Sequence, residues 1–145
     1  MPEPTSPQPH QATTFRIPKH PRNVPDARTQ VRKALADWGL PTDLTADIAL
    51  VATEFVTNSV RHCEVTFSLV EVSLTLHGDH LLLEVSDPDK EKLPTPRTAG
   101  QHDEDGRGLA VIAALTTHWG YDLRRYTKCS WATFPLPETA PACSG

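Results

Sequence analysis

Residues 42–62 read TDLTADIALVATEFVTNSVRH, and the fold prediction depends on this stretch. Apolar residues recur in it at intervals of four, three and four, which is the spacing of one face of an α-helix. They are Leu44, Ile48, Val51 and Phe55. Thr42 or Asp43 can cap the helix, because a short side chain with an oxygen accepts a hydrogen bond from the first helical N–H groups. The stretch therefore predicts an amphipathic helix that runs to about His62.

The residues before this helix predict a strand and another helix. Residues 13–17 are typical of a short strand, and a proline-rich turn follows over residues 18–25. From Asp26 the pattern is helical, and three apolar residues are spaced to share one face. These residues are Val31, Leu35 and Trp38. Gly39 comes directly after them, where the end of a helix favours glycine.

After residue 69 the period changes from that of a helix to that of a strand. Apolar residues alternate with polar ones, which predicts a half-buried strand. They are Val70, Val72, Leu74 and Leu76. Residues 77–80 (HGDH) predict a tight turn, and a return strand with Leu81, Leu83 and Val85 ends at Asp87.

The remaining residues predict a long loop, a third helix and two closing strands. Residues 88–105 hold three prolines and several charges without periodicity, as is common in functional loops. A helix is expected from Gly108, and strands over about 118–125 and 128–134. The inward-facing residues of that helix are predicted to be Leu109, Ile112, Ala113 and Thr116. This order favours an α+β fold, a sandwich with helices on one face of a largely antiparallel sheet.

Length and composition indicate one ordinary globular domain. The chain has 145 residues, of which 38% are hydrophobic and 22% charged. Prolines are frequent at both ends, at Pro2, Pro4, Pro7 and Pro9 and again at Pro135, Pro137 and Pro141. We therefore expect a disordered proline-rich tail over residues 1–12, a folded domain over residues 13–136, and a flexible tail over residues 137–145.

Charge and cysteine content argue against several classes of protein. The formal net charge of −4 argues against direct binding of nucleic acid, which normally needs a basic surface. No apolar run approaches the ~20 residues of a membrane helix, so no membrane association is expected. Cys63, Cys129 and Cys143 form no CxxC pair, which argues against a disulfide or zinc site and favours the cytoplasm.

Three groups of polar residues are candidates for chemistry. The first shares one face of the predicted helix, for which a solvated surface is the simplest interpretation. It consists of Glu54, Asn58, Arg61 and His62. The second is Asp87, at the end of an apolar strand, where a carboxylate can project into a pocket or begin a turn. The third is residues 106–109 (GRGL), where helical N–H groups and the helix dipole favour a phosphate, although a flexible hinge is at least as common.

Taken in this order, the three groups resemble the GHKL ATPases, which include gyrase, the heat-shock-90 chaperones and the sensor histidine kinases. Residues 54–62 (EFVTNSVRH) resemble the asparagine box of that superfamily, and residues 106–109 resemble its Gly-Arg-Gly-Leu helix. The closest likeness is to the bacterial anti-sigma-factor serine/threonine kinases and their small actinobacterial relatives, whose closing strands resemble residues 119–120 and 128–132. The resemblance covers roughly residues 14–135. It implies the two-layer Bergerat sandwich, with a mostly antiparallel mixed sheet and helices on one face.

The resemblance implies a role for each matching residue. Asn58 would coordinate Mg²⁺ through its side-chain oxygen, and Glu54 would be the catalytic base that activates a hydroxyl on a protein substrate. Asp87 would accept a hydrogen bond from the adenine amino group of ATP. The residues that would close over or line the phosphates are Arg61, His62, Gly106, Arg107, Gly108 and Leu109.

The resemblance also implies partners. A kinase of this subgroup sequesters a sigma factor and phosphorylates a serine or threonine on an anti-sigma-factor antagonist, which restores repression of transcription. The implied cofactors are ATP and Mg²⁺, and the implied partners are a sigma factor and the antagonist. A homodimer is also allowed.

One departure from the family pattern leaves alternatives open. The family has Asp-Xaa-Gly-Xaa-Gly after the adenine-binding strand, whereas residues 87–91 read DPDKE, without either glycine and with two more carboxylates. This favours weak ATP binding, or binding only when a partner orders the lid. A binding module without kinase activity is therefore the main alternative. A detached ATP-binding half of a sensor histidine kinase ranks last, because we find no helix pair with a phosphoacceptor histidine.

The segment before the long helix is basic. Residues 16–33 hold six basic residues against one acidic residue, Asp26. The basic residues are Arg16, Lys19, Arg22, Arg28, Arg32 and Lys33. In an acidic protein this asymmetry predicts either attraction of an acidic partner or the solvated face of the first helix.

Overall fold

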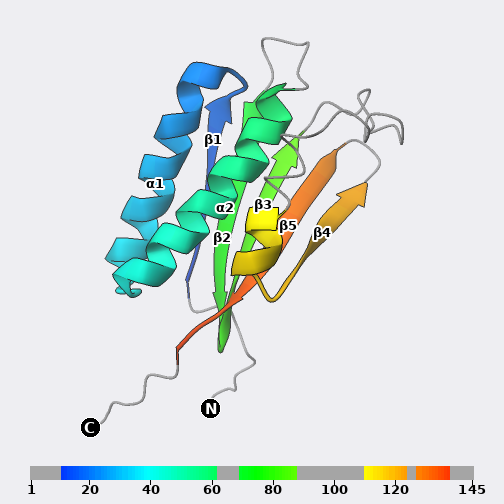
Figure 1. Cartoon of the computed structure of the whole chain (residues 1–145). Helices are drawn as coiled ribbons and strands as arrows, with labels where there is room; N and C mark the ends of the chain where they lie inside the picture. Colours follow the sequence, from blue (N-terminus) through cyan, green and yellow to red (C-terminus); the bar gives the residue numbers. More distant parts are fainter. Residues whose placement is uncertain (1–10, 62–68, 88–109, 124–126, 138–145) are drawn as a thin grey trace, which may run out of the picture.

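The computed structural model describes residues 11–61, 69–87, 110–123 and 127–137. They form a two-layer α+β sandwich, in which two long helices lie on one face of a five-stranded sheet (Figure 1). Residues 110–115 are also helical and lie on the same face. The predicted fold class is therefore confirmed.

The elements follow the predicted order. β1 (Gln11–Pro18) leads through a 3-10 turn, η1 (Pro21–Asn23), into α1 (Val24–Asp37) and then α2 (Thr42–Arg61). β2 (Leu69–His77) and β3 (His80–Asp87) form a hairpin, and β4 (His118–Leu123) and β5 (Lys128–Pro135) come last. The predicted tail over residues 1–12 is two residues too long, because Gln11 and Ala12 belong to β1. Residues 1–10, the loop over residues 88–105 and residues 138–145 lie outside the described residues.

The sheet has the strand order β1-β2-β3-β5-β4, and its four pairings are all antiparallel. A largely antiparallel sheet is thus confirmed, and the described strands include no parallel pair. Among the described strands β5 comes last in the sequence, yet it lies between β3 and β4.

The core lies between the sheet and the helices. Alternate residues of β2 and β3 point towards the helices and are at most 1% exposed. They are Val70, Val72, Leu74, Leu81, Leu83 and Val85. The predicted face of α2 packs against this layer, with Ile48, Val51 and Phe55 buried and Leu44 partly buried. Because each large apolar side chain contributes about 1.5–3 kcal/mol when fully buried, this face holds α2 on the sheet.

The opposite face of the sheet is polar. The Oγ1 atom of Thr14 and the Oγ atom of Ser73 form a hydrogen bond of 2.9 Å, and Arg16 forms an exposed ion pair of 3.1 Å with Glu71. Trp131 of β5 lies against Gly120 of β4, where an added Cβ would be 3.1 Å from the indole ring. Position 120 therefore cannot take a side chain unless the indole moves.

The helix and hairpin boundaries depend on two glycines. Gly39 follows α1 with φ +81°, and Gly78 lies in the turn between β2 and β3 with φ +52°. Only glycine adopts this left-handed region without strain. The predicted end of the first helix and the predicted turn are both confirmed at these residues.

The prediction for the third helix is partly wrong. Ile112 is fully buried, but Ala113 is exposed, and Leu115 packs against the core instead. A helix residue lies about 100° around the axis from its neighbour, so Ala113 turns away once Ile112 points inward. Gly108 and Leu109 lie outside the described residues.

Two predictions from composition can be compared with the described residues. Within them, no helix is long and apolar enough to cross a membrane. Cys129 is a buried thiol, while Cys63 and Cys143 lie outside the described residues.

A buried hydroxyl in α2 gives a test of the packing. The Oγ1 atom of Thr45 is buried and has no hydrogen-bond partner among the described residues. Burying such a hydroxyl costs free energy, so we expect Thr45→Val, which keeps the shape, to raise the free energy of unfolding by about 1 kcal/mol. Urea unfolding with an unchanged slope would measure the gain.

Thr53 provides the matched control on the same helix. Its hydroxyl donates a 2.8 Å hydrogen bond to the carbonyl oxygen of Ala49, so Thr53→Val should bring no gain. A loss of stability in Thr45→Val would mean that the Thr45 hydroxyl has a partner in solution.

Candidate functional site

The polar candidates of α2 are each next in sequence to a buried residue of the same helix. Phe55 and Ser59 point into the core, with 1% and 8% of their surfaces exposed. Glu54 and Asn58 each precede one of these residues, and both are half-buried. Since residues four apart on a helix share a face, the Glu54 carboxylate and the Asn58 amide extend in one direction. The face of α2 that carries Glu54 and Asn58 is therefore not fully solvated.

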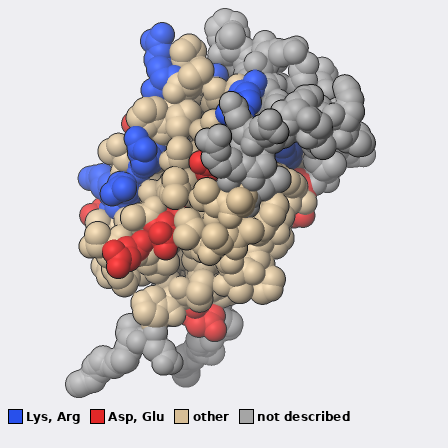
Figure 2. All heavy atoms as spheres, in the orientation of Figure 1, with Lys and Arg blue, Asp and Glu red and all other residues tan. Residues whose placement is uncertain are grey.

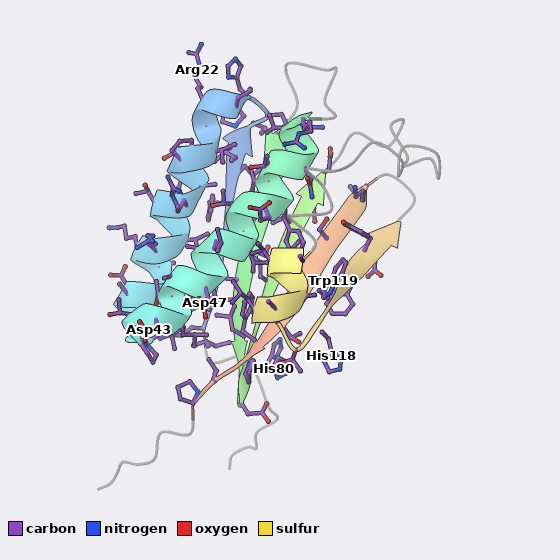
Figure 3. All side chains as sticks on the ribbon, viewed as in Figure 1. Arg22, Asp43, Asp47, His80, His118 and Trp119 are labelled. Carbon is purple, nitrogen blue, oxygen red and sulfur yellow. The ribbon has the colours of Figure 1, made fainter. Side chains whose placement is uncertain are left out.

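The end of α2 carries the next candidates. Arg61 is the last residue of the helix and is exposed. His62 lies outside the described residues. In Figure 3, Asp43 and Asp47 mark the beginning of α2, so Glu54, Asn58 and Arg61 belong to the opposite half of the helix.

Asp87 occupies the last position of β3 and faces the helices. The inward residues Leu83 and Val85 precede it in the same alternation, and its side chain is 16% exposed. Because Asp87 is the last residue of β3, it lies at the end of the sheet where β1 also ends and β5 begins. The predicted placement of this carboxylate at the end of an apolar strand is confirmed.

Lys19 is the residue that the sequence analysis placed wrongly. Its side chain is 1% exposed, and its Nζ atom forms an ion pair of 2.7 Å with Oδ1 of Asp87. It therefore does not belong to a solvated basic surface. The sequence could have indicated this direction, because Ile17 is an inward residue of β1 and Lys19, two residues later, continues the alternation of a strand.

A second lysine is paired with Asp87 in the strand register. Lys128 of β5 is directly opposite Asp87 in the antiparallel register, and residues so paired project to the same face. The Nζ atom of Lys128 lies 4.8 Å from the centre of the Tyr121 ring, a cation–π contact. Tyr121 in turn meets Trp119 edge-on, with ring centres 6.0 Å apart. Lys128 is therefore in register with Asp87, and its ammonium contacts an aromatic ring of β4.

The pKa of one exposed carboxyl is perturbed, at the other end of the sheet. A hydrogen bond with His80 lowers the pKa of Asp79. Figure 3 shows His80 at the start of β3, and Asp87 is at its far end. This shift therefore belongs to the turn and not to the candidate site.

The structure places only part of the predicted site. Glu54, Asn58, Arg61 and Asp87 are described, whereas Gly106, Arg107, Gly108 and Leu109 lie outside the described residues. Within residues 11–61, 69–87, 110–123 and 127–137, no three histidine, cysteine or acidic residues are grouped so as to hold a metal ion. The side-chain oxygen of Asn58 is the donor type that a hard cation prefers, so it suits one ligand of an ion held mainly by phosphates.

Comparisons with known proteins identify the class of protein. The family model of the histidine kinase-like ATPase domain matches residues 17–133. This chain belongs to that family, and the resemblance to the GHKL ATPases is confirmed.

Two individual proteins are also similar to the chain. An uncharacterised protein of Streptomyces coelicolor is 38% identical over 88 residues, which are 57% of this chain and 83% of that protein. The crystal structure of the RsbU and RsbW domains of Rv1364c from Mycobacterium tuberculosis matches with a TM-score of 0.68 and 22% identity. That match covers 88% of this chain and 32% of the other, so the chain spans about a third of that length. At this identity the match shows a common fold.

The ion pair gives a prediction for stability. Asp87→Asn removes the negative charge next to the buried ammonium of Lys19, and breaking a buried pair on one side is costly. We expect the free energy of unfolding to fall by about 3 kcal/mol in a urea titration.

Glu71→Gln is the matched control, because it breaks the exposed pair with Arg16 on the polar face of the sheet. An exposed pair contributes little, so the loss should stay below about 1 kcal/mol. Equal losses in the two variants would show that the buried Lys19–Asp87 pair contributes no more to the free energy of unfolding than the exposed pair does.

Proposed function

We propose that this protein is an ATP-dependent serine/threonine kinase of the anti-sigma-factor type, which phosphorylates an anti-sigma-factor antagonist and so controls the availability of a sigma factor. The observation that carries the proposal is the pair Glu54 and Asn58, half-buried and one turn apart on α2. A protein that only binds a nucleotide has no need of a carboxylate next to the metal ligand. Membership of the histidine kinase-like ATPase family supports the proposal.

The proposed partners are a sigma factor and a small antagonist protein, with a homodimer as one assembly. They are supported by the resemblance of residues 54–62 and 106–109 to the anti-sigma-factor kinases. The proposed location is the cytoplasm, where such partners act.

Each residue of the proposed site has a distinct task. Asn58 would be the protein ligand of Mg²⁺, which when bound neutralises charge on the phosphates of ATP. Asp87 would accept a hydrogen bond from the adenine amino group. The proposed contacts to the phosphates are Arg61, His62, Gly106, Arg107, Gly108 and Leu109.

Glu54 would act on the protein substrate. Its carboxylate accepts the proton of a serine or threonine hydroxyl as that oxygen bonds to the γ-phosphorus. The bond between the γ-phosphorus and its bridging oxygen breaks, and ADP leaves. The product is a phosphorylated antagonist, and the proton on Glu54 returns to water.

A binding module without transfer activity is the second candidate function. Residues 87–91 (DPDKE) lack the two glycines of the family pattern. This departure favours a site that binds ATP weakly or acts through protein contacts.

The two candidates differ in how variants of α2 behave. Asn58→Ala should lose Mg²⁺-dependent ATP binding, because the metal loses its protein ligand. Glu54→Ala should bind ATP within about tenfold of the wild type but transfer phosphate roughly 10²–10⁴ times more slowly, the usual contribution of a positioned base. Calorimetric titration with Mg-ATP and a radiolabel assay with the antagonist measure the two quantities.

Asp47→Ala is the matched control, because Asp47 is an acidic residue of α2 two turns before Glu54 (Figure 3). It should change neither quantity. Wild-type protein that binds ATP and labels no antagonist would leave the binding module as the function. Wild-type protein that binds no nucleotide, even with a partner present, would contradict the nucleotide site itself.

The basic surface that the sequence predicted is smaller than expected. Lys19 is buried and Arg16 pairs with Glu71 on the other face of the sheet, so neither contributes to it. Arg28, Arg32 and Lys33 are exposed on α1. Figure 2 shows Lys and Arg side chains on the side of the molecule that α1 occupies. We propose that this surface of α1 attracts an acidic protein partner.

Charge reversal tests that attraction. Changing Arg28, Arg32 and Lys33 together to Glu should slow association with the antagonist or sigma factor about tenfold or more at low salt, and less at high salt, since salt screens exposed charges. Stopped-flow association rates at two ionic strengths measure the effect. Unchanged rates at low salt would identify these residues as a solvated helix face.

A further inference from the structure

Lys19 is a buried charge to which the proposed phosphate transfer gives no task. Its side chain is 1% exposed, and lysine is almost never buried to this degree unless it is paired. Its Nζ atom is 2.7 Å from Oδ1 of Asp87, a residue 68 positions later in the sequence. The pair therefore joins the end of β1 to the end of β3.

The sheet register explains how the two residues meet. In β2, Val70 is opposite Ile17 of β1. Glu71 of β2 is opposite Ser86 of β3, so one position further along the two strands Val70 is opposite Asp87. β2 separates the two strands, so β1 and β3 are about 10 Å apart. A short side chain at position 19, directly after β1, could not reach Asp87, whereas the long chain of a lysine spans β2.

Stability alone is a weak reason for such a pair. Removing two charges from water costs several kcal/mol per ion, and apolar residues of similar volume are often equally stable in their place. What the pair provides that apolar residues do not is a fixed direction for the Asp87 carboxylate. Pro88 adds to this, because the residue before a proline is restricted to extended backbone.

We propose that Lys19 is a positioning residue for adenine recognition: its ammonium holds Oδ1 of Asp87, and the oriented carboxylate selects nucleotides that carry an amino group on the base. A carboxylate offers about four acceptor positions on its two oxygens, so a bond from Lys19 is compatible with a further bond from adenine. This inference rests on the proposed role of Asp87. It adds a residue that directly follows β1, far in sequence from the asparagine box, to the nucleotide site.

The experiment compares ATP with purine riboside triphosphate, which is ATP without its exocyclic amino group. Both are titrated with Mg²⁺ onto the full chain, and the ratio of the two affinities is measured. The wild type should bind ATP about tenfold or more tightly, the effect of one hydrogen bond to a charged group. Lys19→Met should bring the ratio to within about threefold of one, while the affinity for purine riboside triphosphate changes less than about threefold.

Arg16→Met is the matched control. Arg16 is a cation of β1, three residues before Lys19, and it pairs with Glu71 on the other face of the sheet. Its removal should leave the affinity ratio unchanged. A purely structural role for Lys19 would alter the affinities for both nucleotides together and would not change their ratio.

A measurement on the wild type covers the case in which Lys19→Met does not fold. The Nζ resonance of Lys19, identified by its loss in Lys19→Arg, should shift when ATP binds and stay in place with purine riboside triphosphate. A resonance that responds equally to both nucleotides would overturn the proposal.

The outcomes separate this inference from the proposed function. Wild-type protein that binds neither nucleotide, or binds both equally, would overturn the role of Asp87 and the inference together. A wild type that prefers ATP, with the same preference in Lys19→Met, would overturn the role of Lys19 alone. A preference that rises in Lys19→Met would also overturn it, because Lys19 would then compete with adenine for Asp87.

Discussion

The packing of α2 on the central strands is the constraint on which the rest of the structure depends. Phe55 is buried against the sheet, and Ser59 follows it one turn later with 8% of its surface exposed. Glu54 and Asn58 each precede one of these residues, so their directions are determined by the packing of the core. A rotation of α2 that moved the two polar side chains would also expose Phe55. The hydrophobic core and the candidate site are therefore parts of one arrangement.

The second organising contact is electrostatic, and it lies at the end of the sheet. Lys19 follows β1, Asp87 ends β3 and Lys128 begins β5, and the sheet order brings the three to one end of the sheet. A carboxylate paired with a buried ammonium differs from one that merely begins a turn, which was one interpretation of Asp87 in the sequence. The family assignment and this local chemistry point to the same end of the molecule.

Periodicity predicted most of the fold, because most of the elements bury one regular face. The residues Ile48, Val51 and Phe55 and the alternation in β2 and β3 specify helix, strands and inward side in one step. Of the candidate site, the asparagine box and Asp87 could be located from motifs alone. Their roles stay predictions, as does everything assigned to residues 106–109, which lie outside the described residues.

The misplaced residues have a common physical cause. Lys19 was counted as one charge among six, although its direction is set by the alternation that begins at Ile17 and its partner is 68 residues away. Net charge over a segment contains no information about direction or about distant partners. Ala113 was misplaced for a related reason, since its direction was also not determined: it lies about 100° around the helix axis from Ile112 and turns away when Ile112 faces inward.

The position of β5 between β3 and β4 has a consequence for how the chain folds. β4 is made before β5, yet among the described strands it pairs with β5 alone. During synthesis β4 leaves the ribosome before β5, so it can form its backbone hydrogen bonds to β5 only after β5 has also emerged. Until then the edge of β3 is open to strands of other molecules, a known route to aggregation. The insertion of β5 thus covers the edge of β3 and leaves β4 as the edge strand on that side of the described sheet.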